Sequence, residues 1–529
     1  MYITIAIVTI VVFGISFLKQ ITSVTEGFLL ALILALAAFH IYSYNTDAED
    51  AYIAYRYAHY FANGDGLVFN PGERVEGYSD FLWVVLLGCI HKITTISLPL
   101  LARGLGFLFT IVSIIYTYFI AEKLTGNNKK LSLFAVLLLS CSGCFIAYAT
   151  SGLESPLFSL LLIGVINMVM TEKWFLAGIV IAFATMTRPE GIVMAVPLFL
   201  YVVTKNTVSI RQKMACLIKS LGGALILLLP WTAWRLGYYG YLIPNPMAAK
   251  QGMDKVFQLQ QGLNYFTGHW LRVNIPLFVG IIVLFLLNIK RWRTGILLVS
   301  IVFIYSILYI VIGGDWMPAY RFYSPFYPAM VLIIVLFLNN YQSLMTSFIQ
   351  TIVTVFIFQV SYIFMLNSSF NDSLMKPAID VWREQVKGLG EIGKWFKNSL
   401  PANTVVATFP NGAFSFYNEL YTIDVAGLTD EHIARHGFRF PQGMAGHIAH
   451  DDNYVLSRNP DIIAVMYGQG FEGAPGNHVP EPFTQYYDAV SFQFLEGTNK
   501  CGNYVNLLIN KNRTKEFIQL LSKQNIVHV

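Results

Sequence analysis

Three carboxylates lie within four positions of NTDAEDAYIAYRYAHYFANGDG, residues 45–66: Asp47, Glu49 and Asp50. We expect them to begin a helix that runs to about residue 62 and stops at NGDG. On this helix Glu49 and Asp50 point in different directions, so one can pair with Arg56 while the other faces a cavity. Partial removal from water raises the pKa of a carboxyl group towards that of a general base. The alternative is helix capping, which accounts for one acid better than for three.

A second cluster, GGDWMPAYRFYSP (313–325), opens with two glycines that permit a positive φ or a close backbone approach. Asp315 and Arg321 then flank Trp316 and Tyr320. Aromatic rings beside one acid and one base suit a platform for a sugar next to a clamp for a phosphate. An aromatic belt at the membrane interface is the alternative, and it explains the rings but not the charges.

Three further loops carry polar residues that could contribute to the same chemistry. SGLESP places Glu154 at the start of a predicted helix, and TRPEG contains Arg188 and Glu190. These last two can pair with each other, or Arg188 can bind an anionic group. PNPMAAK contributes Asn245 and Lys250.

The elements that must position these residues are membrane helices. The chain of 529 residues is 55% hydrophobic and 12% charged, about half the charged fraction of a soluble domain. Twelve apolar runs approach the length of a bilayer crossing. They are 1–18, 27–43, 97–121, 131–149, 155–171, 174–187, 190–204, 215–234, 273–289, 294–312, 324–338 and 347–366.

The positive-inside rule orients these helices, because the loops opposite residues 45–96 hold twelve lysines and arginines but only three acids. This topology requires 78–92 to lie along the membrane surface and not to cross it. The loop 44–96, the polar clusters and the tail then share the external face. We therefore expect 11 to 12 transmembrane helices within 1–366, followed by an extracytoplasmic α/β domain over 367–529. In that tail, 404–409 and 461–467 read as strands, 378–398 and 513–523 as helices, and another strand ends near Asp424.

Several classes of function are disfavoured by the same residues. The net charge of +5 does not indicate nucleic-acid binding, and no phosphate-binding or dinucleotide-binding fingerprint follows a strand. The histidines, including those of GHIAHDD (446–452), lack a spacing typical of metal ligands. The close pair Cys141 and Cys144 lies in an apolar run, as expected of core thiols. We expect neither a metal nor a cofactor.

EDAYIAYRYAHYFANGDGLVFNPGERVEGYSDFLW (49–83) resembles the first external loop of GT-C fold glycosyltransferases. The subgroup it resembles is that of the mycobacterial-type terminal β-(1→2)-arabinofuranosyltransferase and its proteobacterial relatives. SGLESPL, TRPEG, PNPMAAK, GGDWMPAYRF and IDVAGLTDEHIA follow that subgroup's pattern in order. The resemblance implies transfer of a sugar from a polyprenyl-phosphate donor outside the bacterial cytoplasmic membrane, with an acidic residue of the first loop as the catalytic carboxylate. It also implies two helices of this loop along the membrane. Relatives usually show paired aspartates before AY, whereas this chain has Glu49 and Asp50.

The resulting hypothesis is a glycosyltransferase that transfers a sugar, arabinofuranose by resemblance, to a glycan, lipid or protein at the periplasmic face of the inner membrane. Asp50 is the first candidate for the catalytic carboxylate, Glu49 the second and Asp47 the third. Transfer of a hexose or an aminopentose is an alternative, as is a flippase for lipid-linked saccharides. The candidates for binding the donor phosphate are Arg188, Arg321 and Lys250. The candidates for binding sugar or acceptor are Arg56, Glu154, Glu190, Asn245, Asp315, Trp316 and Tyr320.

Overall fold

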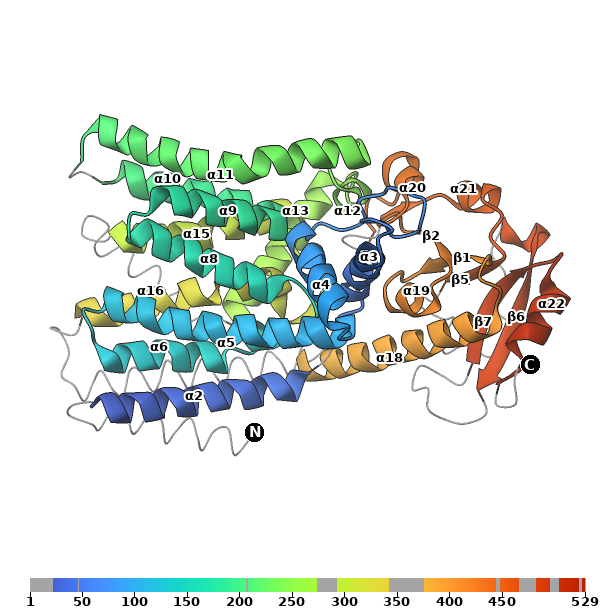
Figure 1. Cartoon of the computed structure of the whole chain (residues 1–529), viewed down its shortest axis with the longest axis horizontal. Helices are drawn as coiled ribbons and strands as arrows, with labels where there is room; N and C mark the ends of the chain where they lie inside the picture. Colours follow the sequence, from blue (N-terminus) through green and yellow to red (C-terminus); the bar gives the residue numbers. More distant parts are fainter. Residues whose placement is uncertain are drawn as a thin grey trace. The chain divides into compact units, whose positions relative to one another are not determined.

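The computed structural model describes residues 22–45, 47–205, 208–273, 293–341, 375–443, 448–465, 482–494, 504–522 and 526–528. The predicted spans 1–18, 273–289 and 347–366 lie outside these residues, except that 273 ends a described helix. The helices and strands are labelled along the chain in Figure 1. The chain divides into two compact units. The bundle unit comprises Met1–Asn45, Ala102–Ala233 and Lys255–Ala378, and the sheet unit comprises Thr46–Leu101, Trp234–Asp254 and Ile379–Val529. The domain boundary expected at 366/367 stays a prediction.

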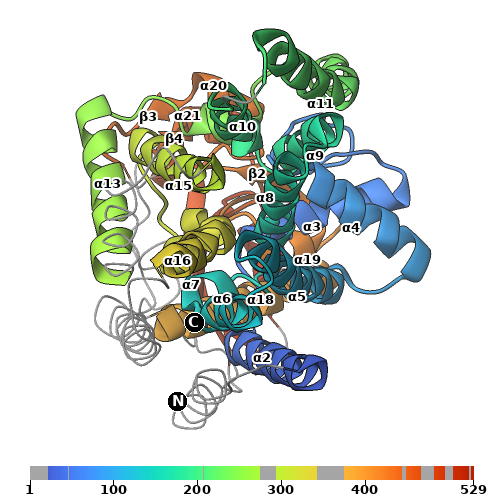
Figure 2. The same ribbon diagram turned by 90° about the vertical axis from the view of Figure 1, so that its left-hand side faces the viewer.

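Helices of the bundle unit run side by side, as the end-on view of Figure 2 shows. In chain order, the helices of this unit, including those that cross its limits, are α2 (Ser23–Tyr44), α5 (Leu98–Leu124), α6 (Lys129–Cys141), α7 (Gly143–Ile146), α8 (Ser155–Met170), α9 (Trp174–Thr187), η1 (Pro189–Met194), α10 (Ala195–Val203), α11 (Ile210–Tyr239), α13 (Lys255–Thr267), η2 (Gly268–Val273), α15 (Arg293–Val311), η4 (Pro318–Phe326), α16 (Tyr327–Tyr341) and the first residues of α18 (Met375–Ser399). Every predicted span that falls within the described residues coincides with one of these helices or with two consecutive ones.

Five helical segments in the described part of the chain are long and apolar enough to cross a membrane: Ser23–Tyr44, Leu98–Leu124, Ile210–Tyr239, Thr294–Val311 and Pro318–Asn339. Shorter apolar helices accompany them, among them Ser155–Met170 and Trp174–Thr187. These segments confirm a polytopic helical membrane protein.

Local sequence explains how individual helices of the bundle begin and how two others meet. The side chain of Thr22 accepts a hydrogen bond from the Thr25 amide at the start of α2, and Pro156 lies in the first turn of α8. Where α9 approaches α11, a Cβ at Gly178 would overlap the Ser220 carbonyl, and one at Gly223 would overlap that of Phe175. Small residues therefore allow these helices to pack backbone against backbone, as is common in membranes.

The sheet unit joins three separate parts of the chain. Its first part holds α3 (Ala51–Asn63) and α4 (Phe81–Thr94), and its second part holds α12 (Asn245–Ala249). The helices of its third part are most of α18, with α19 (Ala413–Asn418), α20 (Glu431–His436), α21 (Asp452–Ser457), η6 (Phe483–Gln485) and α22 (Thr514–Leu521). α3 and α4 pack together closely, since a Cβ at Gly88 would lie 2.6 Å from the Phe61 ring and 3.0 Å from the Ala58 carbonyl oxygen. The predicted helix at 78–92 is α4, and its position along a membrane surface stays a prediction.

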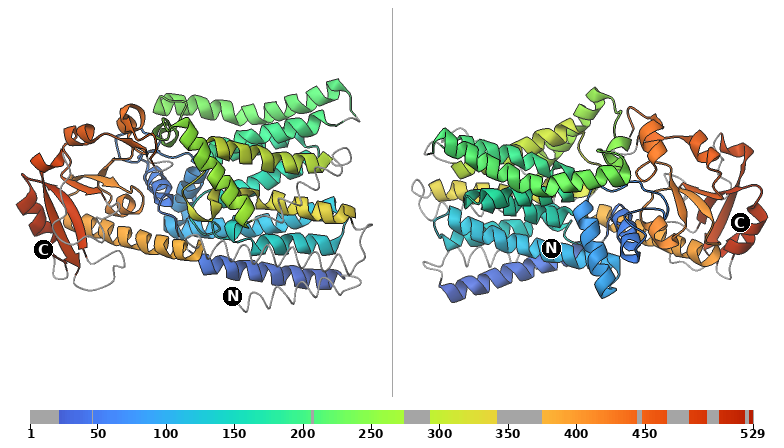
Figure 3. Two further views of the ribbon diagram at one scale, coloured as in Figure 1. Left: turned by 180° about the vertical axis from the view of Figure 1, so that it is seen from behind. Right: turned by 45° about the horizontal axis from the view of Figure 1, so that its top comes forward.

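A six-stranded mixed sheet forms the centre of the third part, with order β2-β1-β5-β7-β6-β8. The strands are β1 (Val405–Phe409), β2 (Tyr421–Asp424), β5 (Ile462–Val465), β6 (Tyr487–Phe494), β7 (Tyr504–Asn510) and β8 (Ile526–His528), and a separate pair is formed by β3 (Phe438–Arg439) and β4 (Ala449–His450). β1 pairs in parallel with β2 and with β5, while β6 pairs antiparallel with β7 and β8. α18 and α22 meet where the Trp395 Nε1 donates to the Leu521 carbonyl at 3.0 Å. Figure 3 shows the sheet, in orange and red, with these helices beside it. The predicted α/β tail is confirmed.

Candidate functional site

Asp47 is buried among tyrosines of its own loop. Its two carboxylate oxygens accept hydrogen bonds from the hydroxyls of Tyr52, at 3.5 Å, and Tyr55, at 3.2 Å. Both tyrosines lie on α3, so these bonds hold the segment before the helix against its first two turns. Asp47 thus stabilises the position of the loop against α3, and its catalytic role stays a prediction.

Glu49 reaches the loop that follows β1. Its Oε1 accepts hydrogen bonds from the amide of Gly412, at 2.6 Å, and from that of Ala413, at 3.1 Å, where α19 begins. In open α/β sheets, the carboxyl ends of parallel strands carry amide groups that bind anionic ligands. Here a carboxyl group of the chain itself takes that position. The expected pairing of a first-loop carboxylate with Arg56 is not the arrangement found for Glu49.

Asp50 lies at the N-cap position of α3, but its side chain makes no capping hydrogen bond. Its backbone carbonyl accepts from the Ile53 amide at 3.1 Å. A capping hydrogen bond, the alternative weighed from the sequence, is therefore not made by the Asp50 carboxylate. Its catalytic role stays a prediction.

Burial, together with the nearby carboxylates of Asp50 and Asp424, raises the pKa of Glu49 to about 8, against the opposite effect of the two amide donors. Asp424, the last residue of β2, is fully buried. Burial raises the pKa of Asp424 to about 6, although its oxygens accept from the amides of Thr429, at 2.8 Å, and Ala426, at 3.0 Å. The raised pKa favours the protonated form of Glu49, and the carboxyl groups of Asp50 and Asp424 are near enough to contribute to it.

Asp424 and Gly412 did not appear among the candidates from the sequence. The available signal was an acid at the carboxyl end of a predicted strand, since TVVATF and the strand ending at Asp424 were both expected. Parallel pairing of β1 with β2 brings their ends to one edge of the sheet. That pairing, and not spacing along the chain, places Asp424 near Glu49.

Arg56 is enclosed by protein and holds backbone groups. Its guanidinium donates to the carbonyls of Phe69, at 2.7 Å, Leu420, at 2.7 Å, and Ser415, and to the Asn70 Oδ1 at 3.1 Å. The residue is 2% exposed. These bonds hold α3 against the α19–β2 segment. The binding of sugar or acceptor by Arg56 stays a prediction.

Within the bundle unit, Arg188 lies between two acids. Its Nη1 is 2.9 Å from the Glu154 Oε1, and its Nε is 2.6 Å from the Glu190 Oε1. The Glu190 carbonyl also accepts from the Tyr305 hydroxyl at 2.9 Å. The pairing alternative weighed for Arg188 is therefore what the structure contains, with Glu154 as a further partner. Binding of a phosphate by Arg188 stays a prediction, and a phosphate would compete with both carboxylates.

Asp315 and Arg321 form a two-bond ion pair, in which the Arg321 Nε lies 2.7 Å and its Nη2 3.0 Å from the two carboxylate oxygens. The preceding glycines have φ values of 92° and 74°, as expected from the sequence. Tyr320 also has a positive φ, 51°, which is costly for a residue with a side chain. The centre of the Tyr320 ring lies 5.4 Å from the centre of the Tyr265 ring. Trp316, four residues earlier in the chain, is half-buried. Their sugar-binding role stays a prediction.

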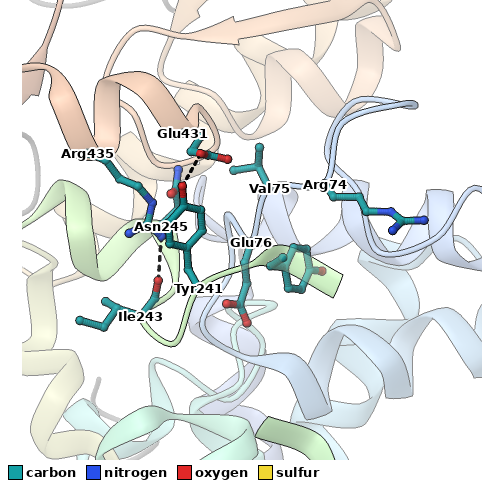
Figure 4. Close-up of a pocket in the computed structure, with 9 residues that line it drawn as sticks. Arg74, Val75, Glu76, Tyr241, Ile243, Asn245, Glu431 and Arg435 are labelled. Atoms are coloured by element: carbon teal, nitrogen blue, oxygen red, sulfur yellow. Dashed lines mark hydrogen bonds between the residues drawn. The ribbon is translucent and has the colours of Figure 1, made fainter. Parts of the chain in front are cut away.

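A small polar pocket lies in the sheet unit beside Asn245 (Figure 4). Asn245 is buried, and its side chain donates to the carbonyls of Asp430, at 2.8 Å, and Gly427, at 3.3 Å. Arg435 lies over the Tyr241 ring, with its guanidinium carbon 3.5 Å from the ring centre. The pocket has room for about one water molecule, too little for a sugar. Lys250 is exposed at the end of α12.

Comparison with known proteins finds matches in both halves of the chain. The family described as dolichyl-phosphate-mannose-protein mannosyltransferase matches residues 90–234, and a domain of unknown function (DUF8728) matches residues 378–509. The terminal β-(1→2)-arabinofuranosyltransferase of Corynebacterium glutamicum is 26% identical over 337 residues, 55% of this chain and 48% of that protein. The chain thus spans about half the length of this curated relative.

Two crystal structures of ArnT from Cupriavidus metallidurans share the fold. The form bound to undecaprenyl phosphate has a TM-score of 0.55 at 11% identity, covering 76% of this chain and 86% of that one. The apo form has a TM-score of 0.55 at 13% identity, covering 84% and 93%. The chain therefore has the fold of the GT-C membrane glycosyltransferases. The resemblance that the first-loop motifs predicted is confirmed, in fold along most of the chain and in sequence along part of it.

Proposed function

We propose that the protein is a membrane glycosyltransferase that uses a polyprenyl-phosphate sugar, with Asp50 as the catalytic base. The observation that carries the proposal is the place of Asp50 in the first loop. Asp50 lies directly before the buried helix α3, in the loop whose motifs resemble those of GT-C enzymes, and next to Glu49, whose carboxyl group accepts from two amides of the sheet unit. The likeness to a structure bound to undecaprenyl phosphate supports a polyprenyl-phosphate donor.

In the reaction, Asp50 accepts the proton of an acceptor hydroxyl group. The acceptor oxygen forms a bond to the anomeric carbon of the donor sugar, and the bond between that carbon and the phosphate oxygen breaks. The polyprenyl phosphate leaves with the electron pair. A positioned base contributes about 10²–10⁴-fold in rate. The protein is proposed to lie in the inner membrane as the sequence predicts. Asp50 and the third part of the sheet unit, Ile379–Val529, here called the α/β segment, then lie on the periplasmic side.

Arabinofuranose is the proposed sugar, supported by the partial similarity to a terminal arabinofuranosyltransferase. The proposed acceptor is a glycan or glycoconjugate of the cell envelope. The reaction is proposed to need no metal, because an arginine or lysine can neutralise a departing monophosphate. Arg188, Arg321 and Lys250 remain the proposed sources of that charge.

The decisive experiment measures transfer of radiolabelled arabinofuranose from polyprenyl phosphate onto cell-envelope glycan by purified protein in lipid. Asp50→Asn is expected to lower kcat at least about 100-fold, while Asp65→Asn, an exposed acid later in the same loop, is expected to retain wild-type activity. Wild-type transfer is expected to persist in EDTA. Undiminished transfer by Asp50→Asn would remove Asp50 from the role of base.

The same preparations separate an enzyme from a flippase. Mass spectrometry of the lipids that co-purify with wild-type protein is expected to find a polyprenyl-phosphate pentose. A flippase would move that lipid across the membrane of vesicles equally well as wild type and as the double variant Asp50→Asn plus Glu49→Gln. This result, together with no sugar transfer by wild type, would favour the flippase.

A further inference from the structure

The α/β segment of the sheet unit is bonded directly to the loop that carries the acids. In the sheet, β1 lies between β2 and β5, and both follow it in the chain. The strand order therefore reverses at the carboxyl end of β1. Open α/β sheets bind their ligands at this point. Here it is Glu49 that meets the Gly412 and Ala413 amides there.

Two further connections fasten the same loop to the same edge of the sheet. The Asn70 side chain donates to the Thr422 carbonyl at 2.9 Å and accepts from the Thr422 amide at 3.1 Å, so it completes the outer edge of β2. Arg56 donates to the carbonyls of Ser415 and Leu420 on either side of the end of α19. α3 packs on α19, and the Tyr52 ring lies 5.6 Å from the Phe416 ring in an edge-on arrangement.

These bonds determine where Asp50 lies. Asp50 follows Glu49 directly and precedes the first residue of α3, so its backbone is held on one side by the start of α19 and on the other by a buried helix. A displacement of about 1 Å at a catalytic group can cost about 100-fold in rate. The contact between Glu49 and the start of α19 is thus suited to set the position of the base.

We infer that the α/β segment is a positioning element for catalysis, which places Asp50 by holding Glu49 at the carboxyl end of β1. This inference rests on the proposed function, in which Asp50 is the base. It gives Glu49 the role of a positioning residue, and it gives the α/β segment a role in the placement of the base.

Gly412 offers a sharp test. A Cβ at Gly412 would overlap the Glu49 carbonyl oxygen and lie 2.6 Å from its Oε1. Gly412 has φ −89° and ψ −92°, outside the α and β regions that alanine favours, so Gly412→Ala displaces Glu49 and also shifts the backbone at the start of α19. Gly237→Ala is the matched control, because a Cβ at this helical glycine of the same unit meets nothing within 4 Å.

The conservative variant is Glu49→Gln. Glutamine has the shape of the protonated acid and keeps an oxygen that can accept from both amides, whereas Glu49→Ala loses it. We expect Gly412→Ala and Glu49→Ala to lower kcat by about 10- to 100-fold with little change in the donor KM. Glu49→Gln is expected to be at least about 10-fold more active than Glu49→Ala, and Gly237→Ala to match wild type.

Hydrogen exchange gives a readout independent of activity. Amides of α3 are expected to exchange faster in Gly412→Ala and Glu49→Ala than in wild type and Glu49→Gln. Wild-type kcat together with wild-type exchange in Gly412→Ala would overturn the positioning role. Glu49→Gln as inactive as Glu49→Ala, with normal exchange, would overturn it too and make Glu49 the acid–base group. Undiminished activity of Asp50→Asn would refute Asp50 as the base. If the Gly412 and Glu49 variants still showed the expected exchange pattern, the contact between Glu49 and the start of α19 would nevertheless stand.

Discussion

Replacement of Arg56 by methionine separates a structural role from a sugar-binding role. The guanidinium donates to three backbone carbonyls and one side-chain amide oxygen, and it is 2% exposed. Methionine fills much of the same volume but donates no hydrogen bond. Arg56→Met therefore leaves the carbonyls of Phe69, Ser415 and Leu420 without this donor.

The expected loss follows from the number of acceptors. The Ser415 carbonyl keeps the Glu419 amide at 3.4 Å, and the Leu420 carbonyl keeps the Thr422 hydroxyl at 3.1 Å, so the full cost falls on the Phe69 carbonyl. A buried carbonyl that loses its donor costs about 1–3 kcal/mol, and each lost bond from a charged donor adds to this. Removal of a buried charge offsets part of the cost, since burial also lowers the pKa of Arg56 and so disfavours its charged form. We expect a net loss of about 2–3 kcal/mol in the free energy of unfolding, which corresponds to about 4–12 °C in Tm for a unit of 150–250 residues.

The assay is the Tm of purified protein in detergent, together with the donor KM. Arg74→Met is the matched control on the same loop, because Arg74 is exposed and its guanidinium lies 4.6 Å above the Tyr238 ring. Such a contact is worth about 0.5–1 kcal/mol, so its Tm should change by no more than about 4 °C. A raised donor KM in Arg56→Met with an unchanged Tm would refute the structural assignment and restore the sugar-binding one.

Two further predictions concern buried charge. Arg188→Met leaves two largely buried carboxylates without their cation, so it should lower the free energy of unfolding by about 3–5 kcal/mol, measured as a lower Tm. Lys397→Met removes an exposed ion pair and should change the Tm little. A raised donor KM of Arg188→Met with an unchanged Tm would instead indicate that Arg188 binds the phosphate. Because the pKa of Glu49 rises from 4.5 to about 8 and that of Asp424 from 3.8 to about 6, the native state holds protons that the unfolded chain releases, so the Tm should fall as the pH rises from about 4 to about 8. Glu49→Gln should flatten the part of this fall between about pH 6 and pH 8, and parallel Tm curves for the variant and wild type would contradict the raised pKa of Glu49.

The membrane helices were the most predictable part of the fold. Their signal is apolar composition over a length set by the bilayer, and this signal depends on no distant contact. Two strands of the sheet were also predicted, because TVVATF and DIIAVMY are continuous apolar runs, whereas their parallel pairing was not. β6 was missed, since Val490, Ser491 and Phe492 are buried in succession and break the alternation expected of an antiparallel strand.

The candidate site was predictable in its residue types but not in its partners. The acids of the first loop and the arginines of the later loops were identified from their unusual place in an apolar chain. Pairing of Arg188 with Glu190 is local and was foreseen as an alternative, whereas its bond to Glu154 joins positions 34 apart. The structural contacts of Arg56 could not be predicted, because most of its acceptors are backbone carbonyls, which any sequence supplies and no pattern marks.

Glu49 illustrates the same limit and also explains a departure from the relatives' pattern. By resemblance, position 49 usually holds an aspartate, and here it holds the acid whose oxygen meets the Gly412 and Ala413 amides. The additional methylene of glutamate extends the carboxyl group beyond the backbone, where the Glu49 carbonyl already lies close to the Gly412 Cα. The residue type at 49 therefore fits a role in reaching the sheet. A proton-accepting role would fall to the neighbour at 50, where this chain keeps the aspartate.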